Sequence, residues 1–90
     1  MLAFRYIDPK APVHLLVVPK RHISGLDSVA VSDAQLLGEI QVVIKELAKA
    51  EKIDESGYRV VINNGKDAGQ AVAHINYHLL GGRKFQWPPG

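Results

Sequence analysis

The chain contains no cysteine in its 90 residues, which excludes disulfide bonds and thiolate metal sites. No apolar run approaches the roughly 18 residues that a membrane span requires. The N-terminus also lacks a basic region followed by the apolar core of a signal peptide. We therefore expect a cytoplasmic protein that has no contact with a membrane.

Neither sign of charge predominates, because 11 Lys and Arg residues stand against 9 Asp and Glu residues. The formal net charge is +2, which is too small to indicate a nucleic-acid interface. Lys20, Arg21 and His22 form a small basic cluster, which we interpret as a solvated turn in preference to a phosphate-attracting patch. With 47% hydrophobic residues, the chain is predicted to be one small folded domain, residues 1–90, with a thin core for which oligomerisation is a common remedy.

One long helix is the clearest element in the sequence. Apolar residues recur at spacings of three and four from Leu36 to Leu47, which is typical of a helix with one buried face. Ser32 followed by Gln35 has the spacing of a capping box and predicts the start of the helix. We expect a helix at about residues 33–51.

Four apolar segments, two on each side of this helix, have the composition of strands. The segment at residues 13–19 is almost wholly apolar apart from His14, which suggests a central strand. Pro9, Pro12 and Pro19 separate or end the first two segments. The strands are expected at residues 2–6, 13–19, 58–64 and 72–80. This order predicts an α+β fold with an antiparallel sheet and one long helix.

The last strand carries the residues that indicate chemistry. Alternation along a strand places His74, Asn76 and His78 on one face, in a row about 13 Å long. The opposite face is mostly apolar and should pack against the helix; it carries Ala73, Ile75, Tyr77 and Leu79. An incidental polar surface is the simplest interpretation. The glycine-bracketed loop at residues 65–70 argues for a site instead, because such loops can offer amide groups to an anion.

Two kinds of histidine chemistry fit this row. A metal site would need a third ligand, such as His14, and ligands about 13 Å apart on a strand could hardly share one ion. Phosphate chemistry fits better, because donating groups spread along a strand can address an extended ligand.

The segment "NNGKDAGQAVAHINYHLLGGRKFQWPPG" resembles the C-terminal half of histidine triad proteins, in the nucleotide-binding branch with adenosine phosphoramidase activity. "APVHLLVVPKRHI" is similar to an upstream block of the same family, and the resemblance covers essentially the whole chain. It implies a homodimer with a joined sheet, and a purine nucleoside monophosphate or phosphoramidate as ligand. It also implies hydrolysis of a P–N bond through a nucleotidyl-histidine intermediate. We expect no cofactor and no metal.

The resemblance implies roles for individual residues. His74 and His78 match the first and third triad histidines, His14 a supporting histidine, and His22 another histidine position nearby. The other matches are phosphate-contacting residues, apolar residues of the nucleoside pocket and a tail residue near the leaving group: Asn63, Gly69, Gln70, Ala71 and Val72; Phe4, Ile7 and Leu16; and Trp87.

Asn76 occupies the position of the nucleophile, where an amide has no basic nitrogen to form a phosphoramidate. Tyr6 stands where relatives carry an acid that binds the ribose, and Ala71 where they often have Ser or Thr. We therefore expect nucleotide binding with turnover lost or very low, whether Asn76 is a natural or an engineered residue. Residual hydrolysis through His78 or His14 is a further alternative.

The resemblance also implies about thirty further residues upstream, a helix and a hairpin, so the chain is expected to be a shortened or fragmentary form. The alternative to nucleotide binding is a non-catalytic interaction or scaffold dimer whose nucleotide site has decayed.

Overall fold

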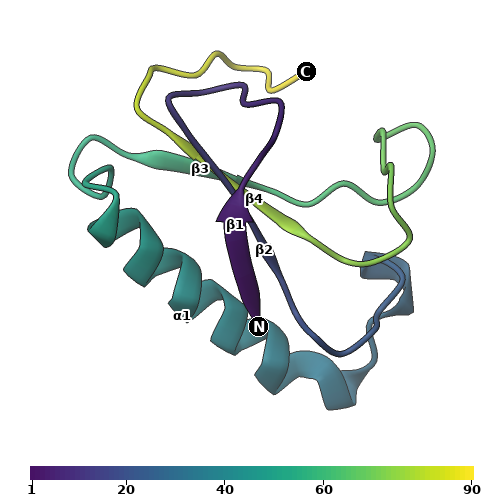
Figure 1. Cartoon of the computed structure of the whole chain (residues 1–90). Coiled ribbons are helices and arrows are strands. Elements are labelled where there is room, and N and C mark those ends of the chain that lie inside the picture. Colours follow the sequence, from purple (N-terminus) through teal and green to yellow (C-terminus); the bar gives the residue numbers. More distant parts are fainter.

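Four strands form one antiparallel sheet in the order β1-β2-β4-β3 (Figure 1). The structure is a computed structural model that describes residues 1–90. The strands are β1 (Leu2–Arg5), β2 (Val13–Val18), β3 (Tyr58–Val61) and β4 (Tyr77–Gly81). The segment at residues 13–19 was expected to be central, and β2 does lie between β1 and β4. The α+β prediction is confirmed.

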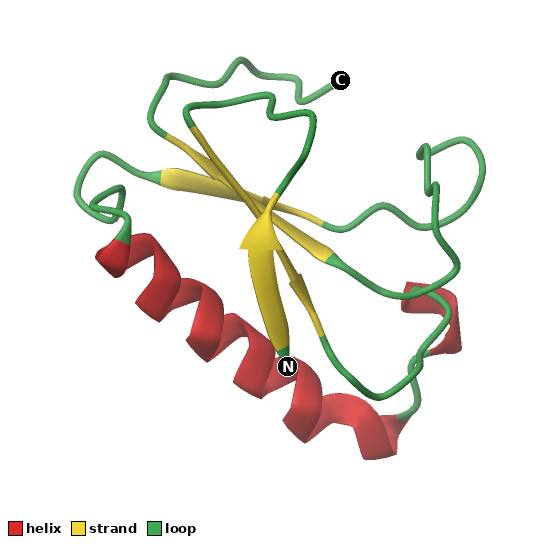
Figure 2. Cartoon of the chain, viewed as in Figure 1, coloured by secondary structure: helices red, strands yellow, loops and turns green.

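The helix α1 (Ala34–Ala50) runs along one side of the sheet (Figure 2). Ile40 and Ile44 of the predicted apolar stripe are buried, and Ala48, one residue beyond the predicted stripe, is buried as well. The predicted capping role of Ser32 is wrong. Ser32 lies in a short 3-10 turn, and Asp33 precedes the helix, where its Oδ2 accepts a 2.8 Å hydrogen bond from the Ala30 amide. No helix in the structure is both long and apolar enough to cross a membrane.

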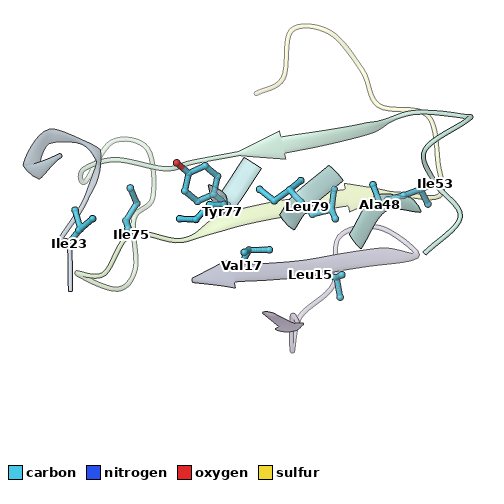
Figure 3. Packing of buried hydrophobic residues seen from close by; sticks show 10 residues of the cluster. Leu15, Val17, Ile23, Ala48, Ile53, Ile75, Tyr77 and Leu79 are labelled. Atoms are coloured by element: carbon cyan, nitrogen blue, oxygen red, sulfur yellow. The ribbon is translucent and has the colours of Figure 1, made fainter. Parts of the chain in front are cut away.

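The core lies between α1 and the sheet face that carries Leu15, Val17, Tyr77 and Leu79. These side chains come from the two central strands, so the core is continuous along β2 and β4. Figure 3 shows Ile23 and Ile75 at one end of this cluster and Ile53 at the other. Side chains on the other face of the sheet point away from the helix, so that face can line a binding site.

The predicted last strand is wrong at its beginning, because residues 72–76 are outside the sheet. β4 pairs with β2 from Tyr77 opposite Val17 onward. The pairing cannot continue past the end of β2, since Pro19 has no amide proton to donate. The Ile75 amide bonds to the carbonyl oxygen of Ile23 instead, at 2.6 Å.

Burial nevertheless alternates through this non-strand segment. Ile75 and Tyr77 are buried, while His74, Asn76 and His78 are half-buried. Ala73 is exposed and does not join the apolar face as expected. The third strand is also shorter than predicted and ends at Val61.

Candidate functional site

A polar cavity of about 140 Å³ lies against the sheet on the side away from α1. β2 contributes Leu16 to it and β4 contributes His78, which are register partners in adjacent strands. The loop after β3 closes the opposite wall. The lining residues are Tyr6, Leu16, Asn63, Gly69, Gln70, Ala71, Val72, Asn76 and His78.

A second cavity of about 300 Å³ shares Leu16, Val72 and Asn76 with the first. Its remaining lining residues come mainly from β1 and β2 and are mostly apolar: Leu2, Phe4, Val18 and His74. A polar and an apolar cavity thus adjoin, and Asn76 stands between them. A ligand that spanned both would place a polar group near His78 and an apolar group near Phe4.

His14 and His78 form the pair at the polar cavity. Nε2 of His14 lies 2.9 Å from Nδ1 of His78. The Tyr6 ring stacks on His14 at 4.5 Å between centroids and meets His78 edge-on at 5.4 Å. Burial, then the charges of His78 and Lys10, lower the pKa of His14, and burial lowers the pKa of His78. Both imidazoles are therefore held neutral near pH 7.

His22 and His74 form a separate pair, with their Nδ1 atoms 3.4 Å apart. Nε2 of His74 donates a 2.8 Å hydrogen bond to the carbonyl oxygen of Pro19, and this bond fixes the orientation of the His74 ring. His14, His74 and His78, the metal-ligand set that the sequence spacing disfavoured, are divided between the two pairs. No group of three or more His, Asp or Glu side chains is arranged to hold a metal ion.

Asn76 turns its amide toward the backbone. Its Nδ2 donates a hydrogen bond of 3.0 Å to the carbonyl oxygen of His74. This bond orients the side chain at the junction of the two cavities, and the amide offers donors and an acceptor but no nucleophilic nitrogen.

The loop at residues 65–70 is held in shape by Gln70. Its Oε1 accepts from the Gly65 amide at 2.9 Å, and its Nε2 donates to the Ser24 carbonyl oxygen at 2.8 Å. Gly65 and Gly69 have φ values of 86° and 82°, which favour glycine.

The predicted anion-binding amides of this loop are already engaged. The amides of Gly65, Gly69 and Gln70 all donate within the loop, so these three cannot bind a ligand without breaking bonds. Ala71 and Val72, at the exit of the loop, line the cavity and have backbone amides with no partner in the chain.

Four residues that the resemblance suggested line neither cavity: His14, His22, Ile7 and Trp87. Ile7 is 96% exposed and Trp87 is 82% exposed, and neither lines the described site. In the basic cluster, Arg21 forms a 2.8 Å ion pair with Asp33, which is buried beside the start of α1. This pairing gives Arg21 a structural contact.

Leu2 and Val18 line the apolar cavity but were not predicted to do so. Period-two alternation places Leu2 beside Phe4 and Val18 beside Leu16, so the sequence held a usable signal. Two backbone contacts had none: the Lys10 amide with Nδ1 of His14, and the Pro19 carbonyl oxygen with Nε2 of His74. Every residue type supplies a carbonyl group, and every type but proline supplies an amide N–H.

Comparison with known proteins identifies relatives of the whole chain. The HIT domain family model matches residues 1–85. An uncharacterized HIT-like protein of Synechococcus elongatus is 48% identical over 89 residues, which are 99% of this chain and 77% of that protein.

Two solved structures extend this comparison. A HIT family hydrolase from Legionella pneumophila has a TM-score of 0.96 and 51% identity, covering 98% of this chain and 79% of that one. A histidine triad nucleotide-binding protein from Candida albicans has a TM-score of 0.77 and 35% identity, covering 96% and 66% respectively.

Proposed function

The chain belongs to the HIT domain family, and we propose on this premise that it binds a purine nucleoside monophosphate or its phosphoramidate. We expect it to hydrolyse the phosphoramidate very slowly or not at all. The relatives include a hydrolase and a nucleotide-binding protein, which support this class of ligand. The observation that carries the proposal is the polar cavity beside the apolar one, joined at Asn76.

The polar cavity suits a phosphate group. His78 is a neutral donor there, and the free amides of Ala71 and Val72 add backbone donors on the opposite wall. Asn63 contributes a side-chain amide to the same lining. The apolar cavity, with Leu2 and Phe4, suits the base of the nucleotide, because ligand sites combine apolar walls with a few placed polar groups.

The low turnover follows from Asn76. In the two-step reaction a neutral imidazole attacks the α-phosphorus, the P–N bond breaks, and the amine leaves with a proton; water then cleaves the new nucleotidyl-histidine bond. An amide nitrogen has no free lone pair for the first step. His14 and His78 bond to each other, and their proposed roles are to donate to phosphate oxygens and to support that donor.

Tyr6 stands at the position where the resemblance implies a carboxylate that binds the ribose. Its ring is committed to stacking on His14, and it lines the polar cavity. A phenol supplies one hydrogen bond where a carboxylate accepts two, so we expect weaker ribose recognition than in relatives that carry an acid there.

A second copy of the chain is the proposed partner. β3 is an edge strand of the sheet, and its Tyr58 and Val60 are 38% and 41% exposed. Pairing between two such edges would extend the sheet and cover this apolar surface. Sedimentation equilibrium should give a dimer, and Val60→Lys should shift it toward monomer.

Calorimetric titration with AMP tests the binding proposal. We expect measurable binding, and about tenfold or greater loss of affinity in His78→Phe, because a hydrogen bond to a charged group contributes about 1.5–3 kcal/mol. Gln41→Ala, on the exposed side of α1, is the control that should bind as the wild type does. No binding by an intact dimer would refute the proposal and favour the non-catalytic interaction dimer.

A further inference from the structure

We propose that the backbone amide of Lys10 sets the proton positions of the His14–His78 pair, so that His78 presents an N–H to the polar cavity. The inference rests on the proposed function only in naming the recipient of that N–H, a ligand phosphate. Lys10 is thus a positioning residue that acts through two histidines without touching the ligand.

The first step is the bond between Lys10 and His14. The Lys10 amide nitrogen lies 3.1 Å from Nδ1 of His14 and donates to it. A peptide nitrogen can only donate, so Nδ1 of His14 must carry a lone pair. A neutral His14 therefore carries its proton on Nε2.

The second step is that the proton position of His14 fixes the proton position of His78. Nε2 of His14 donates to Nδ1 of His78 across 2.9 Å, because the proton of His14 is on that nitrogen. Nδ1 of His78 is then the acceptor, and a neutral His78 carries its proton on Nε2. Nε2 makes no hydrogen bond within the chain, and the His78 ring lines the polar cavity.

The reverse arrangement would defeat phosphate binding. If His78 donated to His14, the proton of His14 would move to Nδ1 and face the Lys10 N–H, which leaves two donors opposed. Nε2 of His78 would then direct a lone pair at phosphate oxygens. The Lys10 amide removes this arrangement before any ligand binds, which is a form of preorganisation.

The surroundings of His14 favour the same neutral state. Only 5% of His14 is exposed, and the Tyr6 ring covers one of its faces. The charged groups nearest to it are Lys10 and Asp8, whose side chains pair with each other at 2.8 Å in solvent. Burial and the positive charge of Lys10 lower the pKa of His14, and only Asp8 opposes them.

Two further bonds hold the loop that carries Lys10. Nε of Arg83 donates to the Lys10 carbonyl oxygen at 3.0 Å, and the Tyr6 amide donates to the carbonyl oxygen of His14 at 2.9 Å. The loop is therefore fixed from the tail of the chain and from its own first residue. These two hydrogen bonds hold the Lys10 amide in its orientation toward His14.

Nitrogen NMR of the ¹⁵N-labelled wild-type protein without ligand is the first test, at about pH 8, where both imidazoles are neutral. Proton–nitrogen correlation should show unprotonated Nδ1 and protonated Nε2 in both His14 and His78. Scalar coupling across the hydrogen bonds should connect Lys10 N to His14 Nδ1, and His14 Nε2 to His78 Nδ1. A protonated Nδ1 in either histidine overturns the proposal.

Two substitutions separate the amide from the side chain of Lys10. Lys10→Pro removes the N–H, and Lys10→Ala keeps it while removing the ammonium group. We expect mixed tautomers only in Lys10→Pro, with AMP affinity about twofold or more below that of Lys10→Ala, since only the competent tautomer binds well. Equal tautomers in the two variants overturn the role of the amide.

If Lys10→Pro does not fold, the scalar couplings across the two hydrogen bonds of the wild-type protein still show whether the Lys10 amide donates to His14. Expected tautomers in a protein that fails to bind AMP would leave this inference standing and refute the proposed function. AMP binding by a protein whose His14 and His78 carry protons on Nδ1 would support the proposed function and overturn this inference.

Discussion

Asn76→His is expected to turn this chain into an efficient phosphoramidate hydrolase. Nδ2 of Asn76 donates to the His74 carbonyl oxygen at 3.0 Å. Nδ1 of a histidine stands the same number of bonds from the backbone as this nitrogen, so it can make the same hydrogen bond. A neutral imidazole with its proton on Nδ1 has its lone pair on Nε2, the state that a nucleophile requires.

The magnitude follows from the site. Position 76 adjoins cavities of about 140 and 300 Å³, so the larger ring enters free space and stability should change by less than about 1.5 kcal/mol. Removal of a nucleophile costs enzymes several orders of magnitude in rate. We expect its restoration to raise kcat/KM at least about a thousandfold, which is about 4 kcal/mol of barrier at about 1.36 kcal/mol per tenfold.

The assay measures release of the amine from an adenosine phosphoramidate by wild type, Asn76→His and Asn76→Gln. The glutamine variant is the matched control, because it changes side-chain length but keeps an amide. Trapping of a nucleotidyl adduct, seen as added mass, should occur only in Asn76→His. If Asn76→His binds AMP but hydrolyses the phosphoramidate no faster than Asn76→Gln does, position 76 is not the position of the nucleophile.

Three other predictions concern stability. The folded-state pKa values of His14 and His78 lie below 6.5, so the unfolded chain binds more protons below that pH; stability should be full above about pH 6.5 and fall as pH drops. The slope should be at most about 1.4 kcal/mol per pH unit for each histidine, measured by urea unfolding, and it should flatten in a His14→Gln, His78→Gln double variant. An equal urea midpoint at about pH 5 and pH 7.5 in the wild type contradicts this reasoning. Gly38→Ala should stabilise α1 by about 0.5–1 kcal/mol, since nothing lies within 4 Å of the added Cβ. Gly81→Ala should lower stability by about 1–3 kcal/mol, because its Cβ would lie 2.5 Å from Cδ1 and 3.0 Å from Cβ of Ile53. Thermal unfolding in which Gly81→Ala is as stable as the wild type would show that the packing of Ile53 against β4 is described wrongly, and a lower melting temperature in Gly38→Ala would contradict the open space at Gly38.

The helix and the apolar faces could be predicted because their signals are local. The stripe with Ile40 and Ile44 appears as a spacing in the sequence, and it packs as expected. The alternation from His74 to His78 also reported side-chain direction correctly at Ile75 and Tyr77. It did not report strand pairing, since a strand needs a partner with free amides and β2 ends before Pro19.

The distribution of the histidines could not be predicted in the same way. The sequence suggested a row of three side chains, but the chain forms two pairs whose members are 64 and 52 residues apart. Such contacts depend on the register of β2 against β4 and on the course of the loop before β4. Neither is encoded in the spacing of one segment.

The sequence alone therefore determined which chemical groups are present: the imidazoles of four histidines, the amide of Asn76, and apolar residues at alternate positions. Only the tertiary structure decided which imidazoles meet, which backbone amides are already engaged, and that Lys10 faces His14. The physical reason is that composition and periodicity follow from residue type, whereas a proton position follows from the hydrogen-bond partner. That partner is brought into contact by the fold.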